Sequence, residues 1–148
     1  MSANSEKRVV ITGASLISPL GNNVQEAFNR LKVYKNCIEY DETLDGYKNL
    51  YTRLSSRVHD FIVPQNFTRK ALRTMGKVSV FATASAQSAL IDAGFIQDDK
   101  INPIIQNGET GVCYGSCSGS MEALMDFYSL YSNKEIGKLN SGSYIKMM

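Results

Sequence analysis

The sequence predicts an α/β protein, because the order strand, glycine-containing loop and helix occurs twice along its 148 residues. In the first unit, the β-branched run within residues 8–12 ends at Gly13, as expected for a buried strand that feeds a tight turn. In the second unit, residues 110–115 form another strand of the buried type, and the loop 115–120 leads into a helix. We therefore expect function in the loops that follow the strands.

Composition excludes several classes of protein. With 43% hydrophobic and 20% charged residues, the chain resembles a globular domain. Its net charge of +2 is spread out, and the basic cluster of Arg69, Lys70 and Arg73 is interpreted as a solvated helix face, so no nucleic-acid partner is expected. No apolar run approaches the roughly 18 residues of a membrane span. Residues 1–7 lack an apolar signal core, so we expect a cytoplasmic protein with no membrane contact.

The cysteines point to neither disulfides nor a metal site. Cys37, Cys113 and Cys117 are an odd and sparse set, which favours reduced thiols. Cys113 and Cys117 lie four residues apart, but no cluster of cysteine or histidine elsewhere and only one histidine, His59, are present to complete a zinc site. We expect no metal.

The first helix is predicted to begin after Asn23. Asn23 can accept a hydrogen bond from a free helix N–H, and Glu26, three residues later, can reach back as in a capping box. The helix is expected to pack on the sheet through one apolar stripe. This stripe consists of Val24, Ala27, Phe28 and Leu31.

The middle of the chain is predicted to begin with a surface loop. Residues 34–51 have no apolar period and are rich in turn formers, so they are expected to form a loop that carries Tyr40, Tyr47 and Tyr51. A short strand is predicted at residues 56–58. His59 follows it and is interpreted as a surface histidine, because no neighbour in the sequence offers it an orienting partner.

Two helices are predicted next. Thr68 can cap a short helix that runs towards Met75. A longer helix over residues 77–93 is rich in small side chains, which allow close approach of a neighbour, and we expect it to be buried. It should end at Gly94, since glycine suits the left-handed position after a helix. Residues 96–109 are polar and turn-prone.

Two functional interpretations of the loops arise from the residues alone. The stretch from Thr12 to Ser15 resembles the opening of a nucleotide-binding fold, but bulky residues lie between Gly13 and Gly21 and no acidic ribose ligand follows, so we reject nucleotide binding. Cys117 lies on a strand-to-helix turn, where a thiol can become nucleophilic. It needs a base, however, and only His59 is available, so a packed turn cysteine is the alternative.

Three segments carry a resemblance to a known family. Residues 8–31, 55–95 and 110–124 are collinear with the N-terminal segment of the β-ketoacyl-acyl-carrier-protein synthases, whose pattern includes V-T-G-x-G, S-P-L-G and a glycine-rich G-x-x-x-G-S-G-x-G-G loop. The chain departs from this pattern at Ala14-Ser15, at Gly76 and in the glycine loop, where it has Cys117, Ser118 and Ser120. These departures indicate a divergent subgroup. A subgroup that handles unusual acyl chains, such as polyenes, is one interpretation.

The resemblance implies a thiolase-like fold, with two similar βαβαβαββ halves in α/β/α layers. Residues 1–148 would be the N-terminal portion of one such domain, truncated before the nucleophile elbow. The nucleophilic cysteine, two histidines and a lysine are expected beyond Met148, so this chain alone would be inactive and Cys117 is not carried over as the nucleophile. No cofactor is implied.

The resemblance also implies an activity and partners. A complete protein would condense an acyl group with malonyl-acyl-carrier protein in fatty-acid or polyketide synthesis. Its partners would be acyl carrier protein, acyl and malonyl thioesters, and a second ketosynthase subunit in a homodimer or heterodimer. The alternative is a non-catalytic partner subunit that resembles a chain-length factor. Ser118 matches the gate of the acyl pocket, and Cys117, Tyr144 and Met148 are candidate pocket or dimer-interface residues.

Overall fold

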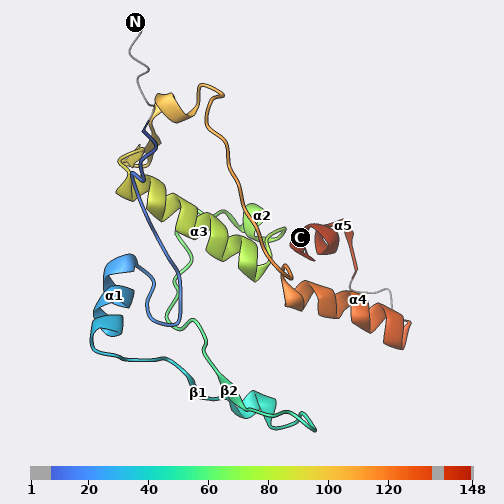
Figure 1. The fold of residues 1–148 in the computed structure, drawn as a ribbon. Helices are drawn as coiled ribbons and strands as arrows, with labels where there is room; N and C mark the ends of the chain where they lie inside the picture. Colours follow the sequence, from blue (N-terminus) through green and yellow to red (C-terminus); the bar gives the residue numbers. More distant parts are fainter. Residues whose placement is uncertain (1–7, 135–138, 148) are drawn as a thin grey trace, which may run out of the picture.

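The computed structural model describes residues 8–134 and 139–147. The long helix α3 lies at the centre of Figure 1, and the other elements are arranged around it as an open assembly. In chain order the elements are α1 (Val24–Lys32), β1 (Glu39–Tyr40), the 3-10 helix η1 (Glu42–Leu44), β2 (Leu54–Ser55), α2 (Arg69–Leu72), α3 (Lys77–Asp92), β3 (Ile96–Gln97), β4 (Lys100–Ile101), the 3-10 helix η2 (Pro103–Ile105), α4 (Met121–Asn133) and α5 (Ser141–Met147).

The start of α1 is formed as the sequence predicts. The Asn23 side chain accepts a hydrogen bond from the Glu26 N–H at 2.8 Å. The Glu26 carboxylate reaches back to the N–H of Asn22 at 3.2 Å, one residue earlier than in a standard capping box. The predicted packing through the apolar stripe is wrong: Ala27 is buried, but Phe28 is 52% exposed, because no sheet lies under this face of the helix among the described residues.

The caps of α2 and α3 also follow the prediction. The Thr68 hydroxyl accepts a hydrogen bond from the Ala71 N–H at 3.2 Å. Helix α3 ends at Asp92, and Gly94 has the left-handed φ of +74°. The prediction that α3 is buried is wrong for most of its length, since Ala84 is the only residue between Lys77 and Asp92 that is fully buried.

The predicted strands at residues 8–12, 56–58 and 110–115 are not formed. The strands of the described residues make two antiparallel pairs instead, β1 with β2 and β3 with β4. A strand needs a hydrogen-bonded neighbour, and none of the described residues supplies one to the predicted segments. Their apolar side chains are consequently open to solvent: Val9 is 98% exposed, Ile11 90% and Val112 80%.

The total surface of the molecule supports the same conclusion. The chain exposes 12592 Å² of accessible surface. A folded monomer of 16.4 kDa would expose roughly 7,500 Å² by the general scaling of surface with mass. The buried apolar residues among the described ones are three alanines, Ala27, Ala84 and Ala123. The helices are therefore in place, but most of the apolar surface that a core would bury is uncovered.

Residues 39–55 form an arm that contains β1, η1 and β2 and lies apart from α3 (Figure 1). The sequence predicts a loop over most of this segment, and the difference is due to Asp41, which is 8% exposed. Its carboxylate accepts hydrogen bonds from the Thr43 N–H at 3.1 Å, the Thr43 hydroxyl at 2.6 Å and the Ser55 hydroxyl at 2.8 Å, and it pairs with Arg57. These bonds join the two strands of the arm.

The stability of the arm is expected to depend on acid pH through Asp41. The hydrogen bonds from Thr43, followed by those from Ser55 and Arg57, lower the pKa of Asp41 from 3.8 to about 2. A carboxyl group with a depressed pKa in the folded state stabilises the fold above its unfolded pKa, and this contribution is lost as the pH falls from about 4 towards 2. In the complete protein, the difference in melting temperature between the wild type and Asp41→Asn should be largest near pH 6 and narrow towards pH 2. A difference that is constant with pH would contradict the prediction.

Candidate functional site

The glycine loop, residues 115–120, connects an irregular segment to α4. The Ser116 hydroxyl accepts a hydrogen bond from the Gly119 N–H at 3.0 Å, and Gly119 has a φ of +61°, which favours glycine. Cys117 and Ser118 are exposed on the loop. The alternative of a packed turn cysteine is therefore wrong for Cys117 in this structure.

The end of the glycine loop is anchored by Ser120, which is 2% exposed. Its N–H donates to the carbonyl of Met147 in α5 at 3.3 Å, and its hydroxyl accepts from the N–H of Val78 in α3 at 3.4 Å. Three helices thus meet at one residue that directly follows Gly119. In the sequence, Ser120 stands out only as a departure from a glycine-rich pattern.

Tyr144 lies on α5, beside α4. Its ring packs edge-on against the Phe127 ring, with 4.7 Å between ring centroids, and the residue remains 59% exposed. Because the carbonyl of Met147 in the same helix accepts from Ser120, the structure links the helix of Tyr144 to the end of the loop that holds Ser118. Met148, the other candidate at this end, lies outside the described residues.

The loop after the first predicted strand packs closely on α3. The Ala14 N–H donates to the Asp92 carboxylate at 2.9 Å. A Cβ atom built on Gly13 would lie 2.4 Å from the carbonyl oxygen of Ala89 and 2.7 Å from the backbone nitrogen of Ala93. The glycine is therefore needed for helix packing. The small residues of α3 were the signal in the sequence for such a close approach.

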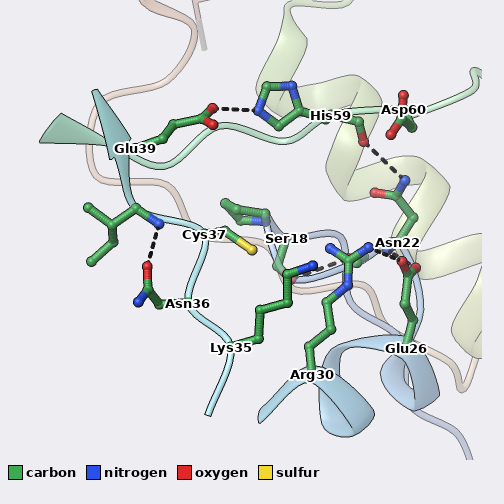
Figure 2. A pocket seen from close by; sticks show the side chains of 13 residues that line it. Ser18, Asn22, Glu26, Arg30, Lys35, Asn36, Cys37, Glu39, His59 and Asp60 are labelled. Atoms are coloured by element: carbon green, nitrogen blue, oxygen red, sulfur yellow. Dashed lines mark hydrogen bonds and ion pairs between the residues drawn. The ribbon is translucent and has the colours of Figure 1, made fainter. Parts of the chain in front are cut away.

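A polar cavity of about 480 Å³ lies beside α1 (Figure 2). At one side of it, the His59 ring contacts the Glu39 carboxylate, with 2.9 Å between Nε2 and Oε1. The prediction that His59 is a surface histidine is confirmed, since its side chain is 59% exposed, but the fold brings to it a partner that lies 20 positions earlier. The lining residues are Ser18, Pro19, Gly21, Asn22, Glu26, Arg30, Lys35, Asn36, Cys37, Ile38, Glu39, His59 and Asp60.

The chemistry available in this cavity is limited by exposure. The side chains of His59 and Glu39 are 59% and 57% exposed, so their interaction is screened by water. Figure 2 shows Cys37 between this pair and the cations Lys35 and Arg30. In the described part of the chain, no group of three or more histidine, cysteine, aspartate or glutamate residues is placed to hold a metal ion. No helix found there has the length and apolar character of a membrane span.

Comparison with known families identifies the chain. The sequence model described as "Beta-ketoacyl synthase, N-terminal domain" matches residues 6–147. The chain belongs to the beta-ketoacyl synthase family. Its fold is therefore the N-terminal part of a thiolase-like fold, and the predicted family and fold class are both confirmed.

Individual ketosynthases agree with this assignment. The chain is 30% identical over 133 residues to 3-oxoacyl-(acyl-carrier-protein) synthase 2 of Synechocystis sp., covering 89% of this chain and 30% of the relative. It is 31% identical over 115 residues to 3-oxoacyl-(acyl-carrier-protein) synthase 1 of Haemophilus influenzae, covering 77% and 26%. A crystal structure of a beta-ketoacyl synthase from Burkholderia phymatum matches with a TM-score of 0.84 and 37% identity, covering 96% of this chain and 34% of that one.

The chain thus spans 26% to 34% of the length of these ketosynthases. The relatives have further chain beyond the part that this chain matches. The assignments of Ser118, Cys117, Tyr144 and Met148 to a pocket or interface stay predictions. The contacts that sequence reasoning missed are those of Gly13, Gly76, Ser120 and Glu39 with distant residues.

Proposed function

We propose that this chain works as the N-terminal part of a longer ketosynthase that joins an acyl group to malonyl-acyl-carrier protein. The observation that carries the proposal is the match of residues 6–147 to the ketosynthase N-terminal domain. It is supported by the activity for which the relatives are named, since they are 3-oxoacyl-(acyl-carrier-protein) synthases. Acyl carrier protein, acyl thioesters and malonyl thioesters are accordingly the proposed partners and substrates.

In the proposed reaction, a cysteine outside this chain takes the acyl group from its thioester and releases the carrier thiol. Malonyl-carrier protein then loses carbon dioxide, and the resulting enolate attacks the acyl-cysteine to form the β-ketoacyl product and free the cysteine. Hydrogen-bond donors from histidines outside this chain would stabilise the developing oxyanion. Residues 1–148 would supply the wall of the acyl pocket, and this chain alone would be inactive.

The test uses the complete protein with acyl- and malonyl-acyl-carrier protein as substrates, in the fatty-acid and polyketide series. A β-ketoacyl product and an equal amount of carbon dioxide are expected from the complete protein. No product from the protein alone, with product restored by a related ketosynthase subunit, would instead support the non-catalytic partner in a heterodimer. No product under either condition would contradict both functions.

Ser118 is proposed as the gate residue of the acyl pocket, where a small side chain leaves the pocket long. Replacing Ser118 with phenylalanine in the complete protein should shift the products to shorter acyl chains, because the ring would fill the inner end of the pocket. The shift should be about tenfold in the ratio of long to short products, the effect of roughly 1.4 kcal/mol of lost transition-state binding. The measurement is the product chain-length distribution by mass spectrometry.

Ser132→Phe is the matched control, because Ser132 is an exposed serine in the last turn of α4. This variant should keep the wild-type distribution of products. An unchanged product distribution in Ser118→Phe would contradict the proposal that Ser118 is the gate. A shift of the same size in the product distributions of both variants would indicate general destabilisation.

A further inference from the structure

The start of helix α3 lacks a side-chain cap of its own. Its N-cap residue is Gly76, which makes no side-chain hydrogen bond, whereas the N-cap residues of α1 and α2, Asn23 and Thr68, each accept one from their own first turn. The first N–H groups of a helix have no partner within the helix, and burial without a cap is costly. Gly76 is buried, so an acceptor for the first turn of α3 can come from a residue packed against it.

Ser120 supplies that acceptor from 42 residues beyond Val78. The Val78 N–H, in the first turn of α3, donates to the Ser120 hydroxyl oxygen at 3.4 Å. Ser120 is 2% exposed, so water cannot readily replace it. This serine is also the N-cap residue of α4, yet its side chain makes no cap bond to α4. Its hydroxyl serves the neighbouring helix instead.

The position of Ser120 is possible only because residue 76 has no side chain. A Cβ atom on Gly76 would lie 2.0 Å from the Ser120 oxygen and 2.5 Å from the carbonyl oxygen of Lys146 in α5. Both distances are far below van der Waals contact. A side chain at position 76 and the serine side chain at position 120 therefore exclude each other, and either one can provide the cap of α3.

We propose that Gly76 and Ser120 are an interdependent pair that positions the glycine loop against α3 and α5. Ser120 is a positioning residue: it directly follows Gly119, its hydroxyl binds α3, and its N–H binds the Met147 carbonyl of α5. Within the loop itself, the described hydrogen bond runs from the Gly119 N–H to the Ser116 hydroxyl, so the pair determines where the loop lies relative to its neighbours. The effect on the acyl pocket rests on the gate role proposed above for Ser118.

The experiment is a double-mutant cycle in the complete protein with Gly76→Ser, Ser120→Gly and both changes together. Gly76→Ser should lower the melting temperature by about 5 °C, the shift typical of an overpacked site. Ser120→Gly should lower it less, by about 3 °C, because a cap is lost and no clash is introduced. The double variant should lose about 5 °C, less than the roughly 8 °C expected from the two changes added together, since the serine introduced at position 76 can cap α3 and no longer meets a side chain at position 120, while its Cβ still lies 2.5 Å from the Lys146 carbonyl oxygen.

The second measurement in the cycle is the ratio of kcat/KM for long over short acyl substrates. Ser120→Gly should change this ratio about fivefold, and the double variant should show the same changed ratio, because both lack the hydroxyl that anchors the loop to α3. General destabilisation would lower the rate for both substrates alike and leave the ratio unchanged. Gly46→Ser is the control, because nothing lies within 4 Å of a Cβ atom at Gly46, and it should change neither quantity. Additive losses of melting temperature in the double variant would overturn the pairing. Non-additive changes of melting temperature with an unchanged substrate ratio would overturn the positioning role. If the wild type catalyses no condensation, the proposed function is contradicted, and the melting temperatures still test the pair.

Discussion

The 148-residue chain produced alone is expected to self-associate rather than to behave as a monomer of 16.4 kDa. The segments that should be central strands expose their apolar side chains, with Val9 98% and Ile11 90% exposed. Leaving such a side chain in water forgoes about 1.5–3 kcal/mol each, and unpaired strand edges recruit other chains. Size-exclusion chromatography with light scattering should show aggregates or oligomers, and calorimetry should show no cooperative transition.

The complete protein is the control for this prediction. The additional chain should cover the same segments, so the complete protein should elute with a single, defined mass and unfold cooperatively. A monodisperse 16.4 kDa species of residues 1–148 that melts cooperatively would contradict the prediction. It would mean that the chain buries its apolar segments by a rearrangement that the structure does not contain.

Replacing Gly13 with alanine in the complete protein should destabilise it by about 3 kcal/mol, the upper end of the usual cost of overpacking. The new Cβ would lie 2.4 Å from the Ala89 carbonyl oxygen and 2.7 Å from the Ala93 nitrogen, two atoms that are hydrogen-bonded to each other at 2.9 Å at the end of α3. Both are backbone atoms of the helix end, so neither can swing aside as the end of a flexible side chain could. Denaturant unfolding should therefore show a lower midpoint for Gly13→Ala.

Gly46→Ala provides the matched control, because an added Cβ at that position meets nothing within 4 Å. The free energy of unfolding of this variant should stay within about 0.5 kcal/mol of wild type, as is usual at an open surface position. A value for Gly13→Ala inside the same range would show that the loop does not approach α3 as closely as described.

The helices were predictable because their signals are local. Asn23, Thr68 and Gly94 act within their own turns of chain, so a few neighbouring residues decide where each helix begins or ends. The family was also predictable, since its motifs are collinear along the sequence. The hairpin arm was missed because its strands are short and its organising residue, Asp41, binds side chains at positions 55 and 57.

The candidate site was likewise predictable from the sequence only in part. The sequence singles out Ser118 and Cys117 by their place in the glycine loop, but it does not reveal what holds that loop. The capping of α3 by Ser120 joins residues 42 positions apart, and the contact of His59 with Glu39 joins residues 20 apart. Neither pair has a periodicity or a spacing that would single it out.

By itself, the sequence determined the family, the fold class, the starts of α1 and α2 and the end of α3, because these depend on motif order and on chemistry within single turns. Only the tertiary structure decided that Gly13 and Gly76 are glycines for lack of space and that Ser120 caps a helix other than its own. The physical reason is that excluded volume and capping between elements depend on atoms that folding brings together. The separation of two residues along the chain does not indicate whether they will be close in space.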